Sequence, residues 1–292
     1  MRVPSKLLLA LTILLWSLTP MMAAFALVDL DPFQLLFWTS LVSVVVLGIV
    51  GLAMGKLKTL NTKSLRDYLI MFGMGALGIF FYYLLYYGAL SFAPVGQANI
   101  INYLWPSFVV VFSIPLLHEK TSWKTAAATL LSLSGAAIII SGGDLSGFSG
   151  SHVPGYLLAL CAAVCYGLFS VLGKKLDFER YSSMFVYYIT AFLLIVPVSL
   201  LVSGFAVPRS WLSIMGVLFL GGLSNSIGFV LWFLALKEGD THRTAIAIFL
   251  VPCLALVWAV LFNKEVVPIT ALVGLGLVLG GIAISMSSDK KK

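Results

Sequence analysis

Ten long apolar segments, separated by short polar connectors, run along the chain. Each is about 20 residues long, which is the length that an α-helix needs to cross the hydrocarbon core of a bilayer. In the first half they cover residues 7–28, 33–53, 68–92, 95–117 and 123–141, and in the second half 155–173, 182–203, 211–236, 244–262 and 267–287. The pattern predicts an all-α integral membrane protein with ten transmembrane helices.

Composition supports a membrane protein and disfavours a nucleic-acid-binding one. The 292-residue chain is 61% hydrophobic and only 10% charged, whereas about 25% of residues are charged in soluble proteins. Its net charge of +7 comes from residues in the connectors rather than from a sustained basic patch, so we expect no nucleic acid partner. Arg2 and Lys6 precede an apolar run of full membrane-spanning length, which we interpret as the first helix and not as a cleaved signal peptide.

The basic residues also predict the orientation in the membrane. If the N-terminus is cytoplasmic, alternate connectors place sixteen of the eighteen Lys and Arg residues inside and leave only Arg209 and Lys264 outside. Cytoplasmic connectors are enriched in Lys and Arg in this way. We therefore expect both termini on the cytoplasmic side of a bacterial inner membrane.

The two halves of the chain repeat one another. A shift of 146 residues brings Ala89, Leu90, Leu104, Pro106, Glu119 and Gly135 onto Ala235, Leu236, Leu250, Pro252, Glu265 and Gly281 without a gap. Because each unit contains five helices, an odd number, the second unit must enter the membrane from the opposite side. The sequence thus predicts two inverted five-helix repeats, residues 1–145 and 146–292, which gives alternating access a structural basis.

These paired positions resemble the EamA-type repeat of the drug/metabolite transporter superfamily. Within that superfamily the chain is most similar to bacterial aromatic amino acid exporters. The resemblance implies export of small metabolites or drugs through a central cavity. It also implies that helices three and four of one half face helices eight and nine of the other.

Helix four carries a polar face inside an apolar segment. Asn99, Asn102, Tyr103 and Pro106 occur at i, i+3, i+4 and i+7 and so share one face, while Trp105 lies about 60° from Asn102 around the helix. Two interpretations stay open for the Asn side chains. They line the cavity that the resemblance implies, or they form hydrogen bonds that pack neighbouring helices together.

Aromatic residues at comparable depths extend this candidate pathway. Tyr82 and Tyr86 share a face of helix three, while Trp16 and Tyr166 occupy matching places in helices one and six. Each could instead serve only helix packing. The candidate substrate-binding residues are Trp16, Tyr82, Tyr86, Asn99, Asn102, Tyr103, Trp105, Tyr166, Asn225, Phe229 and Trp232.

A lining of aromatic rings with a few neutral polar groups suits an amphipathic cargo such as an aromatic amino acid. A flat organic cation would also fit through cation–π attraction. All acidic residues and all three histidines fall in connectors, at helix ends or in the tail. Without a buried proton relay, the simplest hypothesis is uncoupled facilitated transport, and the cation alternative is weakened.

The remaining features predict structural roles. Pro106 and Pro252 should bend helices four and nine, and Glu119 and Glu265 precede the fifth helix of each half, where a carboxylate favours the helix dipole. The spacing of Gly276 and Gly280 permits close helix contact, either internally or in a homodimer. We expect no metal, no cofactor and no enzymatic activity, because the segments lack nucleophile and base pairs. A non-transporting scaffold is the less favoured alternative.

Overall fold

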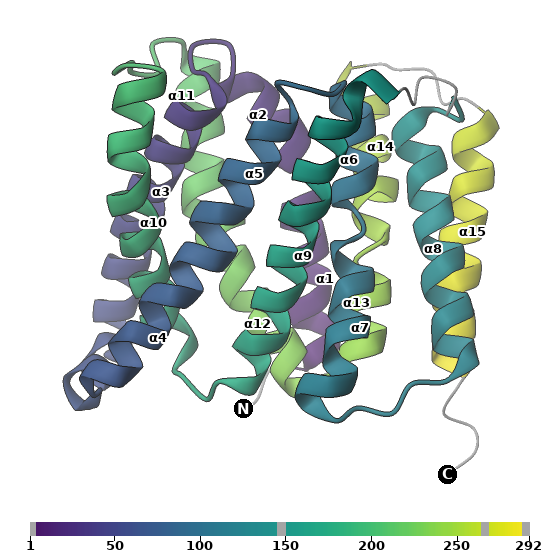
Figure 1. Ribbon diagram of the computed structural model, residues 1–292, viewed down its shortest axis with the longest axis horizontal. Coiled ribbons are helices and arrows are strands. Elements are labelled where there is room, and N and C mark those ends of the chain that lie inside the picture. Colours follow the sequence, from purple (N-terminus) through teal and green to yellow (C-terminus); the bar gives the residue numbers. More distant parts are fainter. Residues whose placement is uncertain (1–3, 145–149, 264–268, 288–292) are drawn as a thin grey trace.

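The computed structural model describes residues 4–144, 150–263 and 269–287 (Figure 1). Within these ranges it contains ten helices that are long and apolar enough to cross a membrane, and no strand. They are Ser5–Ala26, Pro32–Ala53, Leu65–Ala89, Val95–Leu117, Trp123–Ser141, Gly150–Lys175, Arg180–Val202, Trp211–Glu238, Thr241–Phe262 and Ile269–Ser287. The predicted all-α fold with ten transmembrane helices is confirmed, and most predicted ends agree within three residues.

Several of these membrane-spanning helices consist of shorter pieces. In the first half the elements are α1 (Ser5–Ser17), α2 (Thr19–Ala26), α3 (Pro32–Ala53), the 3₁₀ helix η1 (Lys56–Thr62), α4 (Leu65–Gly75), η2 (Ala76–Phe81), α5 (Tyr82–Ala89), α6 (Val95–Asn102), α7 (Trp105–Leu117) and α8 (Trp123–Ser141). In the second half they are the 3₁₀ helix η3 (Gly150–His152), α9 (Val153–Lys175), α10 (Arg180–Val202), α11 (Trp211–Phe219), η4 (Leu220–Ile227), α12 (Gly228–Glu238), α13 (Thr241–Ala247), α14 (Leu250–Asn263) and α15 (Ile269–Ser287).

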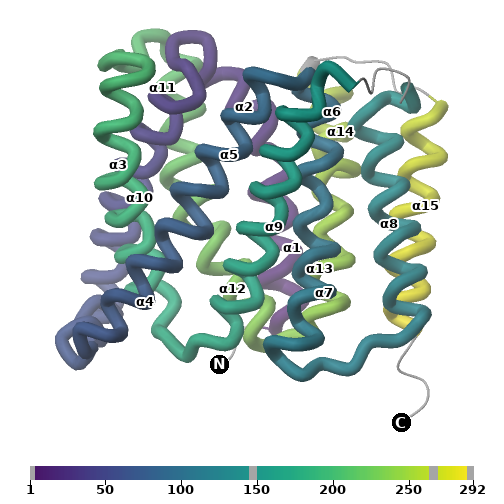
Figure 2. The backbone as a smooth tube through the Cα atoms, in the orientation of Figure 1, coloured from purple at the N-terminus to yellow at the C-terminus, as the bar shows by residue number. Residues whose placement is uncertain are grey.

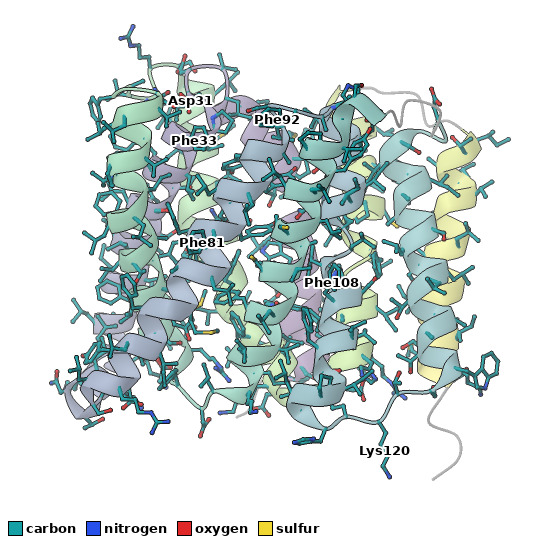
Figure 3. The ribbon with its side chains drawn as sticks, viewed as in Figure 1. Asp31, Phe33, Phe81, Phe92, Phe108 and Lys120 are labelled. Atoms are coloured by element: carbon teal, nitrogen blue, oxygen red, sulfur yellow. The ribbon has the colours of Figure 1, made fainter. Side chains whose placement is uncertain are left out.

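Polar residues outside the apolar segments fix where helices begin. Asp31 caps α3, because its carboxylate accepts hydrogen bonds from the backbone N–H groups of Phe33 and Gln34. Ser64 caps α4 in a reciprocal arrangement with Asp67. Such caps satisfy backbone donors that the helix itself leaves unpaired. They therefore set the helix ends at the edges of the bundle, where Asp31 is labelled in Figure 3.

Helices three and eight each contain a π-helical segment at matching places. The segment η2 interrupts helix three and η4 interrupts helix eight. A shift of 146 residues moves 76–81 onto 222–227, which lies within η4. A π-helical turn accommodates an extra residue and is frequent at functional sites. Each segment leads directly into residues that line the cavity described below, Tyr82 after η2 and Phe229 after η4.

Helices four and nine are also interrupted at matching places. The break between α6 and α7 falls at residues 103–104, and the break between α13 and α14 falls at residues 248–249. Pro106 and Pro252 each lie in the first turn of the segment that follows. Proline is tolerated there because the N–H that it lacks has no partner within the helix.

The path of the chain is easily followed in Figure 2. It starts with α1 at the lower edge, and α8 ends at the upper edge. It then re-enters with α9 from the upper edge and reaches the lower edge again at the end of α15. The two halves therefore cross the bundle in opposite directions.

Helices α8 and α15 pack closely along one side of the bundle (Figure 1). A Cβ atom added to Gly135 would lie 2.5 Å from the carbonyl oxygen of Gly274, and one on Gly281 would lie 2.7 Å from that of Ala128. These glycines thus permit the close approach of the two backbones. Gly276 has no described neighbour within 4 Å of such an atom, so its side of α15 is free of close internal contacts.

Candidate functional site

A cavity of about 380 Å³ lies between helices of both halves. Ten of the eleven residues predicted from the sequence line it: Trp16, Tyr82, Tyr86, Asn99, Asn102, Tyr103, Trp105, Tyr166, Asn225 and Phe229. They come from six different helical elements, α1, α5, α6, α7, α9 and α12, together with η4 and the break after α6. The fold therefore brings these ten residues, up to 213 positions apart in the sequence, around one space.

Trp232 is the predicted residue that does not line the cavity. Its side chain is fully buried, and its indole Nε1 donates a hydrogen bond to the hydroxyl of Ser170 at 3.1 Å. Its ring lies 5.7 Å from that of Trp16 and 5.4 Å from that of Trp105. Trp232 thus lies behind the cavity wall and supports it.

Further lining residues were not predicted from the sequence. They are Thr19, Pro20, Ala23, Ala24, Leu27, Leu35, Tyr83, Tyr87, Leu90, Val95, Ser224, Ile248 and Val251. Tyr83 and Tyr87 belong to the same tyrosine-rich stretch as Tyr82, on the neighbouring face of helix three. Pro20, two residues after the break at Leu18 in helix one, was the available signal for the residues of α2.

Two hydrogen bonds join polar side chains of the cavity within the first half. The hydroxyl of Tyr86 donates to Oδ1 of Asn99, and Nδ2 of Asn102 donates to the hydroxyl of Tyr82 at 3.2 Å. Both bonds join helix three to helix four. The two interpretations of these Asn side chains are therefore compatible, because the amides bind a neighbouring helix and also border the cavity.

Two further hydrogen bonds connect the halves across the cavity. The hydroxyl of Tyr83 donates to Oδ1 of Asn225 at 3.3 Å, and the hydroxyls of Thr19 and Ser224 lie 2.8 Å apart. None of the residues that line the cavity carries a charged side chain. In the described part of the chain, no group of three or more His, Cys, Asp or Glu side chains could hold a metal ion. Recognition in this space therefore depends on rings, hydroxyls and amides.

Five aromatic side chains close the cavity toward the edge where α1 begins. We call Trp16, Trp105, Tyr166, Phe229 and Trp232 the aromatic floor. The ring of Trp105 lies 4.7 Å from that of Tyr166, and the ring of Trp16 lies 5.5 Å from that of Phe229, both edge to face. Such edge-to-face contacts between buried rings are favourable. The floor is therefore a tightly packed barrier.

The other end of the cavity reaches the opposite edge of the bundle. Leu27, Leu90 and Val95 line it there, next to the connectors between α2 and α3 and between α5 and α6. Phe92, labelled near the upper edge in Figure 3, lies in the second of these connectors. Leu27 and Val95 are 41% and 58% exposed. The cavity is thus accessible from the edge opposite the first residues of α1.

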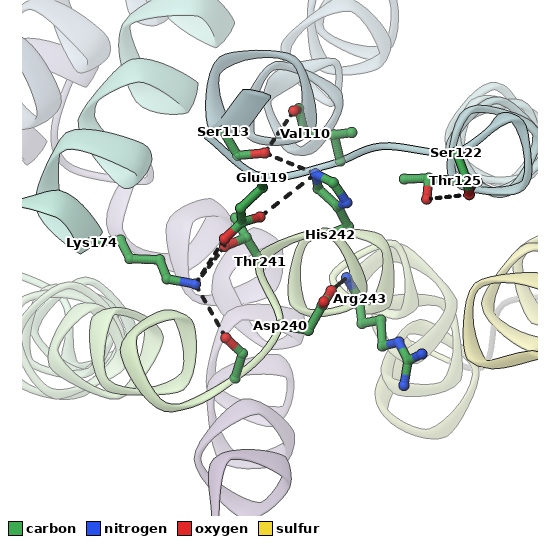
Figure 4. Close-up of polar contacts among 11 residues, drawn as sticks. Val110, Ser113, Glu119, Ser122, Thr125, Lys174, Asp240, Thr241, His242 and Arg243 are labelled. Carbon is green, nitrogen blue, oxygen red and sulfur yellow. Dashed lines mark hydrogen bonds and ion pairs between the residues drawn. The ribbon is translucent and has the colours of Figure 1, made fainter. Parts of the chain in front are cut away.

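Glu119 does not contact the start of helix five as the sequence suggested. The hydroxyl of Ser122 caps α8 instead, by accepting a hydrogen bond from the N–H of Thr125. The carboxylate of Glu119 points toward Lys174 and His242 (Figure 4). Its matched residue, Glu265, lies outside the described residues.

The chain matches the EamA-like transporter family twice, at residues 4–141 and 153–287. It belongs to this family. The family consists of transporters, so the chain is a multi-pass membrane transporter and not an enzyme. Each match spans five of the ten helices.

Similar proteins include named exporters. The aromatic amino acid exporter YddG of Ancylobacter novellus is 28% identical over 280 residues, which cover 94% of this chain and 93% of that protein. A probable terminal-alkyne amino-acid exporter of Streptantibioticus cattleyicolor is 30% identical over 75% of this chain and 73% of its own length. A crystal structure with 24% identity has a TM-score of 0.87 and covers 98% of this chain and 99% of its own, which shows a shared fold.

Proposed function

We propose that this protein exports aromatic amino acids, or similar small amphipathic metabolites, across the bacterial inner membrane. The observation that carries the proposal is the uncharged cavity of about 380 Å³, with aromatic walls and a few amide and hydroxyl groups. Its volume falls within the range of about 300–1,000 Å³ that is typical of small-molecule sites. The family and the two amino acid exporters among its relatives support the same class of cargo.

The lining favours a cargo with a ring and a compact polar end. Tyr82, Trp105 and Phe229 offer ring faces and edges for an aromatic side chain. Amide and hydroxyl groups from Asn102 and Tyr86 can orient the ammonium and carboxylate. A net charge would be costly to bring into a space without a charged partner, whereas the two charges of a zwitterion offset one another.

Alternating access between two inverted five-helix repeats, residues 1–145 and 146–292, is the proposed mechanism. The opposite directions of the halves in Figure 2 support it. So do the paired interruptions in helices three and eight and in helices four and nine. With cytoplasmic termini, which the distribution of Lys and Arg favours, the open end of the cavity would face outward.

Transport without energy coupling is the simplest proposal for this cavity. No carboxylate or imidazole lines it, so no proton-binding group is available beside the cargo. The alternative cargo is a flat aromatic cation, which the same rings would attract. The absence of a lining carboxylate makes that alternative weaker, since a buried cation prefers an anionic partner.

The proposal is tested by uptake of labelled phenylalanine into proteoliposomes that contain the purified protein. Uptake is measured with and without an imposed pH gradient, and with excess unlabelled tryptophan as competitor. Saturable, competed uptake that reaches the same level in both conditions supports an uncoupled aromatic amino acid carrier. Accumulation driven by the pH gradient would overturn the uncoupled mechanism, and uptake no greater than in empty vesicles would overturn the cargo.

Ligand-dependent stability separates a carrier from a scaffold. A cargo that binds only the folded state stabilises it by mass action. Phenylalanine or tryptophan at millimolar concentration should therefore raise the unfolding temperature of the purified protein in detergent, whereas glycine should not. Equal unfolding temperatures with all three would favour the scaffold.

A further inference from the structure

A polar cluster lies at the closed end of the molecule, beyond the aromatic floor. It consists of Glu119, Lys174, Thr241 and His242, and we call it the polar latch (Figure 4). Glu119 follows α7 in the first half, whereas the other three residues belong to α9 and α13 in the second half. The polar latch therefore connects the two halves at the edge where α1 begins.

Lys174 is the centre of the polar latch. Its ammonium donates to Oε1 of Glu119 at 3.2 Å, to the carbonyl oxygen of Gly239 at 3.2 Å and to the hydroxyl of Thr241 at 2.6 Å. The Lys174 and Glu119 side chains are only 19% and 25% exposed. Multiple charge-assisted bonds in such a partly buried place are stronger than those of a solvent-exposed ion pair.

The second oxygen of Glu119 faces His242. The two atoms Oε2 and Nε2 are 3.6 Å apart, and the same Nε2 lies 2.9 Å from the hydroxyl of Ser113 in α7. His242 is buried. Both contacts connect His242 of α13 to the first half, at Ser113 in α7 and at Glu119 just after α7.

The polar latch is close to the aromatic floor along α9. Ser170, which accepts the hydrogen bond from the indole of Trp232, precedes Lys174 by four residues, or about one turn. Opening a path from the cavity to this edge would require the floor to separate. Because α7 carries Trp105 and α9 carries Tyr166, movement between these helices would also separate Glu119 from Lys174.

Within the described residues, the repeat counterparts of Lys174, Thr241 and His242 form no polar cluster at the open end. A shift of 146 residues places Val95 and Gly96 at the positions of Thr241 and His242. Helices one and six match at a shift of 150 residues, which places Ala24 at the position of Lys174. Val95 and Ala24 line the cavity at and below its open end. Neither side chain can bind a carboxylate, so among the described residues the counterparts of Lys174 and Thr241 form no such cluster.

We propose that the polar latch is an asymmetric gate lock that sets the resting state of the carrier. Its charge-assisted bonds hold the end near the first residues of α1 closed, while Ala24 and Val95, the counterparts of Lys174 and Thr241, offer no such bond at the other end. This inference rests on the alternating-access function proposed above. A ligand-free carrier with the lock intact favours the state seen here, and breaking the lock shifts the population toward the state open at the opposite end.

The test uses two cysteine reporters in a background from which Cys161, Cys165 and Cys253 have been replaced by alanine. S170C, fully buried between the floor and the polar latch, reports opening of the closed end. A23C, on the cavity wall in α2, reports the end that is open here. Reaction rates with a water-soluble maleimide are measured in lipid nanodiscs, where both membrane faces are accessible and no cargo is needed.

The variants E119Q and K174M remove one charge each from the polar latch. K237M is the matched control, because it removes the ion pair between Lys237 and Asp177 at the same edge. The side chains of Lys237 and Asp177 are 43% and 86% exposed, and both residues belong to the second half. We expect E119Q and K174M each to raise the reaction rate of S170C about tenfold while A23C reacts at the same or a lower rate. The double variant should match the single ones, and K237M should change neither reporter.

Three results would overturn the lock. In the first, S170C reacts no faster in E119Q or K174M than in the parent. In the second, K237M raises the reaction rate of S170C as much as the latch variants do. In the third, both reporters react faster, which would indicate a general loosening of the fold. If only one latch variant folds, that variant alone decides among these outcomes. Phenylalanine uptake by the unmodified protein separates the two proposals: uptake without a reporter response refutes the lock, and a reporter response without uptake refutes the cargo but keeps the lock.

Discussion

Asn102 illustrates how a polar residue is accommodated inside a membrane-spanning helix. Its Nδ2 donates to the hydroxyl of Tyr82, whereas its buried Oδ1 has no hydrogen-bond partner among the described residues. Interhelical bonds of this kind are worth about 1 kcal/mol in a membrane. One such bond contributes little to folding, and we therefore propose that the amide of Asn102 beside the cavity serves binding.

Replacing Asn102 or Tyr103 tests that role. Asn102→Ala and Tyr103→Ala should each lower phenylalanine uptake about tenfold by removing a cavity contact, while the yield of folded protein stays near that of the parent. Uptake in proteoliposomes and size-exclusion chromatography measure the two properties. Thr129→Ala is the matched control, because Thr129 is buried in α8 away from the cavity lining. Loss of folded protein in the Asn102 variant would assign the amide to packing alone.

The hydrogen bonds of Asp29 at the open edge predict that the stability of the folded protein depends on pH. Its carboxylate accepts hydrogen bonds from the backbone N–H groups of Ser210 and Arg209, both at 2.7 Å, and these bonds hold the pKa of Asp29 below its ordinary value of 3.8. The bonds join the connector after α2 to the connector before α11. A lowered pKa means that the stabilisation is complete above the ordinary value and is lost as pH falls through the folded-state pKa.

Thermal unfolding of the parent protein and of Asp29→Asn in detergent measures this effect. The parent should unfold at a higher temperature by an amount that is constant above about pH 5 and shrinks as the pH falls below about 4. A difference that stays constant down to pH 3 would show that ionisation of Asp29 does not stabilise the fold.

At the residue scale, the sequence predicted most residues of the cavity wall but not where the cavity ends. Helical spacing placed Asn99, Asn102 and Tyr103 on one face, and all three border the cavity. Helical spacing does not reveal the depth at which a cavity ends. The sequence therefore could not show that Trp232 lies behind the cavity wall. The sequence did not predict the ion pair between Lys174 and Glu119, because the two residues are 55 positions apart and belong to different halves.

At the scale of the elements, the sequence predicted the helices but not how they are divided. Hydropathy defined all ten membrane-spanning helices, and Pro106 and Pro252 indicated the interruptions in helices four and nine. No comparable residue marked the π-helical segments η2 and η4. The sequence of η2 is apolar, whereas η4 also contains Ser224, Asn225 and Ser226. The π-helical turns therefore depend on packing against neighbouring helices rather than on one residue type.

Gly78, within η2, shows this dependence on packing. A Cβ atom at this position would lie 2.0 Å from the ring of Phe169, which is fully buried in α9. Gly78→Ala should therefore destabilise the protein by about 1–3 kcal/mol, as overpacking does, and should lower uptake by displacing the adjacent Tyr82. Thermal unfolding and uptake are the measurements.

Gly73 in α4 provides the control for that substitution. It belongs to the same membrane-spanning helix, and a Cβ atom there would meet no atom within 4 Å. Gly73→Ala should leave uptake unchanged and raise stability by up to about 1 kcal/mol, because alanine has the higher helix propensity. Equal effects of the two substitutions would mean that the contact between η2 and α9 does not constrain the fold.

At the scale of the whole molecule, the proposed orientation combines the distribution of charge with the path of the chain. Lys and Arg residues gather in alternate connectors, and this signal requires no knowledge of packing because it reflects insertion into the membrane. The structure places the start of α1 and the end of α15 at one edge, and the end of α8 and the start of α9 at the other (Figure 1). If the termini are cytoplasmic, the connector between the halves must be outside.

Fusions of alkaline phosphatase, which is active only outside the inner membrane, test this orientation. A fusion after Gly142, at the end of the first five helices, should be active. A fusion after Lys175, one helix later, should be inactive because α9 returns the chain to the cytoplasm. The opposite pair of results would reverse the whole molecule, so that the cavity would open to the cytoplasm and the polar latch would close the outer end. Equal activity of both fusions would contradict the antiparallel crossing on which the inverted repeat depends.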